Sequence, residues 1–446
     1  MGIAPLLTRA LGYIAAGFHR IERAGERLPD GPLLVVANHP NSLLDPLVIF
    51  RIAGRATRPL AKAPLFEQAG VGLLLRAMNG LPVYRREDDP GRMSGNEDTF
   101  RAAIDALRAG EAVQIYPEGI SHNEPHIQPL KTGAARIALA AEAQAGWSLG
   151  LRIVPVGLTY SRKTLYRGRA VAQVGESIAV TEWRSAHEAD PQQAVRELTA
   201  EIGRRMDHVT LNLAEREDRA LVETAERLWA SEKALAGWRE RTELAHRLPR
   251  LQAFARGLAW LRAHDPARHA ALARSVRRYR RRLAAVGAGV AEAPPEYPVR
   301  DVVRYGAPKV LLLLLTLVPG LLGIIMWAPP YWLTRLAVRR IDPPREDTIA
   351  TYKLAAAVLA YPLAWLAWTA LAAWLLGTGA AVAAGLALWP LGAIGVYWKL
   401  RFERLIEDAG LFYRLLTHPD RQAALAEERR RLVREFDEIW ERATRP

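Results

Sequence analysis

The sequence contains no cysteine. Disulfide bonds, thiolate metal sites and a cysteine nucleophile are therefore excluded, and a zinc site would need histidine and carboxylate ligands alone. No Gly-x-Ser-x-Gly motif occurs in the first 180 residues, so a serine nucleophile on a strand-to-helix elbow has little support. No segment repeats at a fixed period, which argues against a repeat architecture.

The charge balance favours anionic partners. The chain of 446 residues has 61 Lys and Arg against 47 Asp and Glu, a net charge of 61 − 47 = +14. Phospholipid surfaces, nucleic acid and phosphorylated substrates would all suit this charge. No recognised nucleic-acid motif accompanies it, whereas the last third carries membrane-length apolar runs. We therefore expect a phospholipid membrane as partner, and no nucleic acid.

Two uncharged runs predict membrane segments. Residues 354–398 form 45 residues without a charge, about 67 Å of helix at 1.5 Å per residue, enough to cross a bilayer core of about 30 Å twice. Gly377-Thr378-Gly379 is the natural turn, so we predict a transmembrane hairpin. The second run, Val310–Thr334, is interrupted by Pro319-Gly320 and Pro329-Pro330, which predicts a re-entrant or interfacial segment.

Basic residues flank both runs, and cytoplasmic loops are rich in Lys and Arg. If the 310–334 segment is re-entrant, all of these basic residues lie on the cytoplasmic side, and only the Gly377–Gly379 turn lies on the opposite side of the membrane. We therefore predict a multi-pass membrane protein, in the inner membrane if it is bacterial, whose N-terminal domain faces the cytoplasm. The flanking basic residues are Arg300, Arg304, Lys309, Arg335, Arg339, Arg340, Arg345, Lys353, Lys399, Arg401 and Arg404.

The first 180 residues alternate short aliphatic strands with helical segments, which is typical of an α/β fold. The predicted strands are 33–37, 112–116 and 153–160, and the predicted helices are 99–109 and 132–145. The apolar segment Leu6–Phe18 is too short to span a bilayer and is predicted to be a membrane-lying or core helix.

An Arg-rich helical region follows. Arg250–Arg282 contains ten Arg and one acidic residue, Asp265, with apolar residues between them. This mixture suits an amphipathic helix on anionic lipid or the solvated face of a helical bundle, and the sequence leaves both open. Gly287–Pro298 is predicted to be a linker.

The sharpest motif is Asn38-His39-Pro40-Asn41-Ser42-Leu43-Leu44-Asp45-Pro46, directly after a predicted strand. His39 and Asp45 could not share a face of a continuous helix, so they meet only if Pro40-Asn41-Ser42 turns the chain. Asp45 could then accept the Nδ1 proton of His39 and leave Nε2 free as a base. The alternative is structural: Asp45 would be a helix N-cap before Pro46.

Two further motifs suit an anion site. Tyr116–His122 follows another strand and contains Glu118-Gly119, where the glycine permits a close approach of the backbone to a ligand. Lys131 stands near the start of the next helix, where backbone N–H groups favour anions. Gly80–Arg86 ends in adjacent arginines that could bind a phosphate. Each motif could also be an ordinary loop with solvated charges.

Taken in order, these segments resemble the glycerolipid acyltransferase superfamily, the glycerol-3-phosphate and lysophosphatidic acid acyltransferases. The resemblance covers roughly residues 15 to 210 and four blocks: 38–45, 80–85, 116–121 with Lys131, and 153–157. It implies that His39 is the general base and that Asp45 orients it. Arg85 and the third block would hold the phosphate, and Pro155 would line the acyl site. The substrate-binding residues so implied are Asn38, Arg85, Glu118, Gly119, Ser121, Lys131 and Pro155.

The chain departs from the common family pattern at two points. Five residues rather than four separate His39 from Asp45, and Ile120-Ser121 follows Glu118-Gly119 where the family usually has Thr-Arg. Both features are similar to the glycerol-3-phosphate/dihydroxyacetone-phosphate acyltransferase branch known from yeast. This favours glycerol 3-phosphate as acceptor, with Lys131 supplementing Arg85.

The resemblance implies a membrane-bound enzyme of phospholipid biosynthesis. It would move a fatty acyl group from an acyl thioester, acyl-CoA or acyl carrier protein, to a hydroxyl of glycerol 3-phosphate or lysophosphatidic acid, and neither a cofactor nor a metal is implied. A transacylase acting on finished phospholipids and a non-catalytic membrane-surface binding protein remain alternatives.

The expected organisation has five parts. An acyltransferase domain with a mixed central sheet flanked by helices and an N-terminal membrane-lying helix occupies 1–210, and a basic helical region with a linker occupies 211–300. The re-entrant or interfacial segment with its basic loop spans 301–353, the transmembrane hairpin 354–398, and a cytoplasmic helical tail 399–446.

Overall fold

The computed structural model describes residues 3–67, 71–84, 95–232, 243–285, 299–340, 346–417 and 419–444. The chain divides into two compact units. The first combines residues 1–216 with 243–255 and 345–351, and the second contains 217–242, 256–344 and 352–446. The predicted linker Gly287–Pro298 lies outside the described residues.

An eight-stranded mixed sheet forms the centre of the first unit, in the order β1-β7-β6-β2-β5-β3-β4, with β8 paired to β6. β2 lies between β6 and β5 and is parallel to both, and β3 and β4 continue the parallel array. The carboxyl ends of these five strands therefore meet at one edge, where ligands bind in α/β sheets. The strands are β1 His19–Ala24, β2 Leu33–Ala37, β3 Thr57–Lys62, β4 Leu81–Val83, β5 Ala112–Ile115, β6 Arg152–Tyr160, β7 Gly168–Val174 and β8 Ile178–Ala179.

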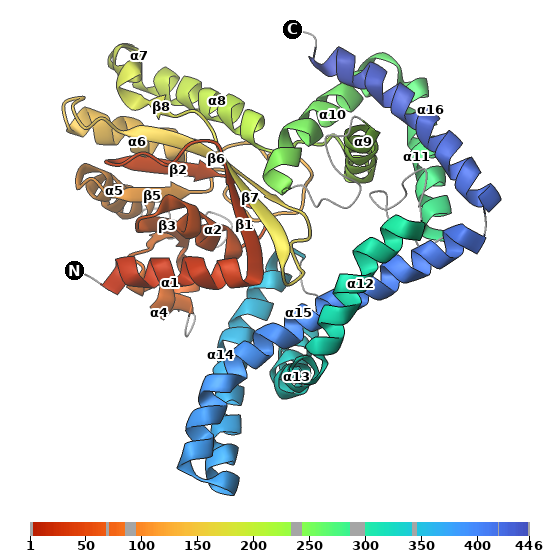
Figure 1. The fold of residues 1–446 in the computed structure, drawn as a ribbon. Helices are drawn as coiled ribbons and strands as arrows, with labels where there is room; N and C mark the ends of the chain where they lie inside the picture. The colour runs from red at the N-terminus through yellow and green to blue at the C-terminus, as the bar shows by residue number, and fades with distance from the viewer. Residues whose placement is uncertain are drawn as a thin grey trace. The chain divides into compact units, whose positions relative to one another are not determined.

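Helices cover both faces of the sheet, as Figure 1 shows. Alternate residues of β2 point to opposite faces, so Leu34 and Val36 pack against α5, α6 and α8, while Leu33 and Val35 pack against α2. The two layers confirm the predicted α/β class. The helices of this unit are α1 Ile3–Phe18, α2 Leu44–Ala53, α3 Ala63–Glu67, α4 Val71–Ala77, α5 Gly95–Arg108, α6 Gly133–Gln144, α7 Arg184–Ala189 and α8 Pro191–Val209, with a 3₁₀ turn at Val180–Trp183.

Helix α1 has two apolar faces. Leu11 and Ala15 are buried, and the helix packs on α2. Leu6 and Tyr13 on the opposite face are 71% and 62% exposed. One face therefore belongs to the core, and the other is free to lie on a membrane.

The second unit is helical. In α11 the apolar residues Leu272, Val276, Tyr279 and Leu283 are buried, and the helix packs on α9 and α16. The bundle alternative therefore holds for α11, because its apolar face is covered by protein. The described helices are α9 Asp218–Glu232, α10 Leu244–His264, α11 Pro266–Ala285, α12 Val299–Leu315, α13 Leu317–Arg339, α14 Glu346–Leu376, α15 Thr378–Thr417 and α16 Pro419–Thr444. Both α10 and α14 begin in the first unit.

Among the residues that the structure describes, three helices are long and apolar enough to cross a membrane: 317–339, 348–376 and 378–406. The last two form the predicted hairpin, which turns at Gly377 with a φ of 88° (Figure 1). The outward-facing side chains of both helices are apolar and exposed, for example Trp374 at 81% and Leu386 at 74%. Helix α13 packs closely on α15, because a methyl group at Gly323 or Gly395 would overlap the backbone of the other helix.

The predicted helix breaks at Pro319-Gly320 and Pro329-Pro330 are wrong. The helix is interrupted at Thr316 and then runs without a break from Leu317 to Arg339. Pro319 falls in its first turn, where an amide hydrogen has no intrahelical partner. Pro330 cannot donate to the Met326 carbonyl, but the Trp368 indole N–H donates to that oxygen at 2.9 Å instead. A neighbouring helix thus satisfies the group that the proline frees.

Candidate active site

The predicted turn between His39 and Asp45 is present. The amide N–H groups of Leu44 and Asp45 donate to the carbonyl oxygens of Asn41 and Ser42 at 3.0 and 3.2 Å, and Ser42 has a φ of 42°. This turn reverses the chain between the end of β2 and the start of α2.

The turn brings the two side chains into a hydrogen bond. His39 Nδ1 lies 2.8 Å from Asp45 Oδ2, and the carboxylate side chain is 0% exposed while the imidazole is 17% exposed. A carboxylate only accepts, so Nδ1 carries the hydrogen and Nε2 of the neutral ring keeps its lone pair. Among the described residues, no group is hydrogen-bonded to Nε2. The ring can therefore act as a base toward a bound hydroxyl.

Asp45 is not the N-cap of α2. That position belongs to Leu43, which makes no side-chain cap bond. Instead, Asp45 Oδ2 also accepts the Asn41 amide N–H at 2.7 Å, and Oδ1 accepts the Tyr160 hydroxyl at 2.7 Å. Three donors therefore hold the buried carboxylate in one orientation.

Tyr116 lies flat against His39. Their ring centroids are 4.1 Å apart with an interplanar angle of 20°. Burial, with a contribution from the charge of Asp45, raises the pKa of Tyr116 well above its ordinary value. Its hydroxyl donates to Gln114 Oε1 at 3.1 Å, and the Gln114 amide donates to Thr57 Oγ1 at 3.0 Å. These bonds fix the tyrosine ring on which the imidazole stacks.

Glu118 is buried, and its carboxylate has three described hydrogen-bond partners. Oε1 accepts the backbone N–H of His39 at 3.1 Å, and Oε2 accepts that of Gln128 at 2.8 Å. The His122 ring Nε2 is hydrogen-bonded to the same Oε2. The carboxylate thus ties the end of β2 to the 122–128 loop, and its side chain has no exposed surface to offer a phosphate. Its role in this geometry is to position His39.

Ser121 joins the same two motifs. Its Oγ accepts the backbone N–H of Ser42 at 3.1 Å and lies 3.1 Å from the Ser42 hydroxyl. The amide of His122 also donates to the His39 carbonyl at 3.2 Å. The first and third blocks therefore form one continuous loop surface around the imidazole.

Gly119 and Lys131 form the cationic part of the site. Gly119 has a φ of 74°, and a Cβ there would lie 2.9 Å from Lys131 Nζ. The Lys131 amide donates to the Pro117 carbonyl at 2.8 Å, and helix α6 begins two residues later. Because the ammonium lies over bare backbone near a helix N-terminus, this corner suits a phosphate.

The described contacts of Asn38 and Pro155 are with the sheet and its core. The Asn38 side chain pairs with the backbone of Leu158: its amide donates to the carbonyl at 3.1 Å, and Oδ1 accepts the N–H at 2.6 Å. Pro155 is buried in β6 on the face near Val209, which packs with α5, α6 and α8. Tyr116 and Tyr160 lie on the other face. Asn38 therefore makes a strand-fixing contact, Pro155 lies on the sheet face opposite Tyr116 and Tyr160, and the binding of substrate by either residue stays a prediction.

Arg85 lies outside the described residues, and its contact with phosphate stays a prediction. Sequence reasoning missed Tyr160 and Lys163. The sequence predicts Tyr160 only as the end of the strand 153–160, although that strand ends at the same sheet edge as His39, a position that favours functional residues. Lys163 Nζ donates to the Pro40 carbonyl at 3.3 Å and to Asn123 Oδ1.

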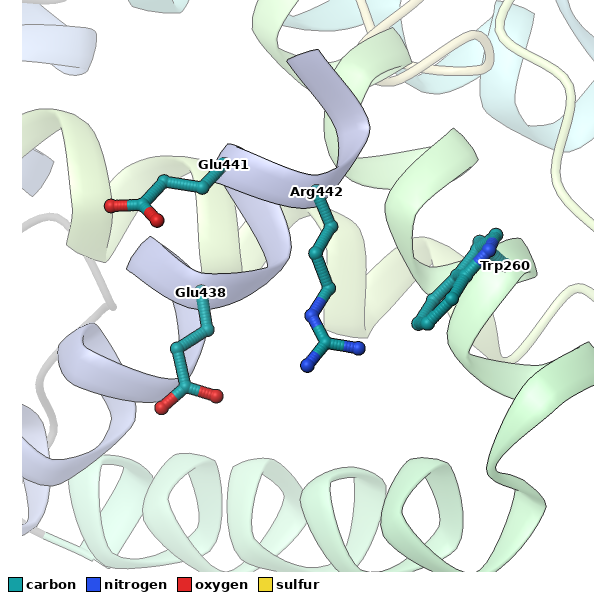
Figure 2. A pocket seen from close by; sticks show the side chains of 4 residues that line it. All are labelled: Trp260, Glu438, Glu441 and Arg442. Carbon is teal, nitrogen blue, oxygen red and sulfur yellow. The ribbon is translucent and has the colours of Figure 1, made fainter. Parts of the chain in front are cut away.

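A separate cavity of about 460 Å³ lies in the second unit, lined by Trp260, Glu438, Glu441 and Arg442. Figure 2 shows Arg442 extending toward the Trp260 ring, and its guanidinium carbon lies 5.1 Å from the ring centroid. Glu438 is paired with Arg268. None of these residues belongs to the His39 site, and no base with a buried acidic partner lines the cavity.

Comparison with known proteins identifies the segment that carries the site. Residues 20–159 match the family model described as Acyltransferase. The chain is 33% identical over 135 residues to glycerol-3-phosphate O-acyltransferase 2 of Saccharomyces cerevisiae, 30% of this chain and 18% of that protein. It is 24% identical over 300 residues to an uncharacterized acyltransferase of Schizosaccharomyces pombe, 48% of this chain and 44% of that protein.

Among solved structures, the crystal structure of the 1-acyl-sn-glycerophosphate (LPA) acyltransferase PlsC from Thermotoga maritima matches with 22% identity and a TM-score of 0.30. The match covers 43% of this chain and 78% of that chain. The chain spans 18% of the length of the first two curated relatives. The match to the family model confirms the resemblance to acyltransferases for the segment containing His39, Asp45 and Glu118.

Proposed function

We propose that this protein transfers a fatty acyl group from an acyl thioester to a hydroxyl of glycerol 3-phosphate or 1-acylglycerol 3-phosphate at a membrane. The observation that carries the proposal is the His39–Asp45 hydrogen bond of 2.8 Å, with Nε2 left as a base in a segment that matches the acyltransferase family. Asp45 holds the ring in the required tautomer.

The reaction needs one base and no covalent acyl-enzyme. His39 Nε2 takes the proton of the acceptor hydroxyl as its oxygen attacks the thioester carbonyl carbon. The carbon–sulfur bond then breaks, and the leaving thiolate takes the proton from the imidazolium. The buried Asp45 carboxylate stabilises the imidazolium during the interval.

Phosphate binding orients the acceptor. Lys131, which lies over Gly119, supplies one positive charge beside the base, and Arg85 is proposed to supply a second. A phosphate held there fixes the hydroxyl near the thioester carbon and lowers the entropic part of the barrier. The chain's Glu118-Gly119-Ile120-Ser121 sequence and the name of the S. cerevisiae relative support glycerol 3-phosphate as acceptor.

The membrane receives the product. Helices long and apolar enough to cross a bilayer belong to the same chain as the site, and the acylated product dissolves in lipid. The proposed topology places the acyltransferase domain on the cytoplasmic side, because Lys and Arg flank the apolar segments.

Release of free thiol provides a direct test. The protein has no cysteine, so a thiol reagent detects only the released CoA or carrier-protein thiol. Purified protein in lipid is assayed with acyl-CoA or acyl carrier protein against glycerol 3-phosphate and lysophosphatidic acid. His39→Ala should abolish transfer, whereas His187→Ala, a histidine of α7 outside the site, should not.

Three results would contradict the proposal. Near wild-type turnover by His39→Ala would show that His39 is not the general base. Acyl transfer between phospholipids without thiol release would indicate a transacylase. Lipid binding with no transfer to either acceptor would indicate a membrane-surface binding protein.

A further inference from the structure

The Asp45 carboxylate has a hydrogen-bond donor on each oxygen. Oδ2 accepts from His39 Nδ1 and from the Asn41 amide, and Oδ1 accepts from the Tyr160 hydroxyl at 2.7 Å. The Asn41 and His39 contacts arise within one turn of chain, but Tyr160 is 115 residues away in the sequence. Tyr160 also lies one residue beyond the segment that matches the family model.

The tyrosine is rigidly placed. It is the last residue of β6, it is 5% exposed, and it pairs with Ala170 of the antiparallel β7. Its ring packs at 5.4 Å from the buried ring of His19. Burial, and then the charge of Asp45, raise the pKa of Tyr160 well above its ordinary value. The hydroxyl therefore keeps its hydrogen and donates it to Oδ1.

We infer that Tyr160 is a positioning residue of the acyl-transfer site, whose hydroxyl orients the Asp45 carboxylate that in turn orients His39. The inference rests on the proposed function. Without the donor on Oδ1, the carboxylate can rotate about its Cβ–Cγ bond and change the direction of the hydrogen bond between Oδ2 and Nδ1. The imidazole then spends less time with Nε2 aimed at the acceptor hydroxyl.

The hydroxyl also limits how strongly Asp45 attracts a proton to the ring. A hydrogen bond to Oδ1 withdraws part of the carboxylate charge, so its loss leaves a carboxylate that stabilises the imidazolium more strongly. A protonated ring cannot act as a base. Removal of the hydroxyl should therefore move the acidic limb of the kcat/KM profile to higher pH, an effect that loss of packing alone would not produce.

Other ionisable groups near the His39–Asp45 pair are unchanged when the Tyr160 hydroxyl is removed. They should therefore contribute equally to the pH profiles of the wild-type protein and the variant. They come from the strands and loops packed around the pair: His19, Tyr116, Glu118, His122, Lys131 and Lys163.

The test is Tyr160→Phe in the full chain reconstituted in lipid. This change removes one oxygen and retains the ring. We expect kcat to fall about tenfold, as is typical for partners of a functional side chain, with KM for both substrates within about twofold and the acidic limb moved to higher pH. Tyr279→Phe, at a buried tyrosine of α11 in the second unit, should change neither kcat nor the profile.

A double-variant cycle covers the case in which Tyr160→Phe is less stable. If the hydroxyl acts through the carboxylate, Tyr160→Phe and Asp45→Asn should be non-additive in kcat, because both alter one group. An unchanged pH profile with additive effects would overturn the inference. If His39→Ala remained active in the same assay, the proposed function itself would fail, and the role of Tyr160 with it.

Discussion

Asp45→Asn tests the central pair most sharply, because the structure predicts how the amide will orient. The Asn41 backbone N–H can only donate, so the amide oxygen must take the Oδ2 position next to it. The NH₂ group then faces the Tyr160 hydroxyl, which can rotate and accept. The amide oxygen still accepts from His39 Nδ1, so the correct tautomer is retained.

The expected loss of kcat in Asp45→Asn therefore comes only from the missing negative charge of the carboxylate. A hydrogen bond to an ionised group contributes about 1.5–3 kcal/mol and a neutral one about 0.5–1.5 kcal/mol. Losing that difference, about 1–2 kcal/mol, lowers kcat by about 5- to 30-fold, since 1.36 kcal/mol corresponds to a factor of ten. A ring held in the wrong tautomer would instead lose about 10⁴-fold.

The assay is thiol release at saturating acceptor, with thermal unfolding measured alongside. Asp190→Asn is the matched control, because Asp190 caps α8 by accepting the N–H groups of Gln192 and Gln193 at 2.9 and 3.0 Å. It should lower stability by about 1 kcal/mol or less and leave kcat unchanged. A 10⁴-fold loss at Asp45→Asn would refute the predicted amide orientation, and an unchanged kcat would refute the pair itself.

Three further outcomes are expected. Lys131→Ala should raise KM for the phosphorylated acceptor far more than KM for the acyl donor; equal changes would indicate a structural role. Burial lowers the pKa of His19 below 6.5, so its neutral state stabilises the fold above pH 6.5 and stability should decline as pH falls below that value. In thermal unfolding measured against pH, His19→Phe should flatten that decline. An unchanged dependence of stability on pH would mean that another group causes the decline. Basic residues on both sides of 310–334 favour the cytoplasmic side for both of its ends, so in intact cells an impermeant thiol reagent should label a cysteine at position 378 but not at 343. Labelling at 343 would make 310–334 a true span.

The sequence alone determined the local features of the protein. Five predicted strands and helices of the α/β region, the Gly377 hairpin turn and the need for a turn between His39 and Asp45 all follow from patterns within a few residues. Such patterns can be recognised in the sequence because side-chain periodicity, turn-forming residues and the length of uncharged runs are all properties of short stretches of chain. The pairing of His39 with Asp45 follows from the same local logic.

Only the tertiary structure decided which groups from distant parts of the chain meet. Glu118 reaches the His39 amide across 79 residues, Tyr160 reaches Asp45 across 115, and Asn38 reaches Leu158 across 120. Strand order sets these contacts, because β5 and β6 flank β2 and their carboxyl ends share one edge. The continuity of α13 also depends on the tertiary structure. The local sequence Pro329-Pro330 predicts a break, but a tryptophan from another helix supplies the missing hydrogen-bond donor.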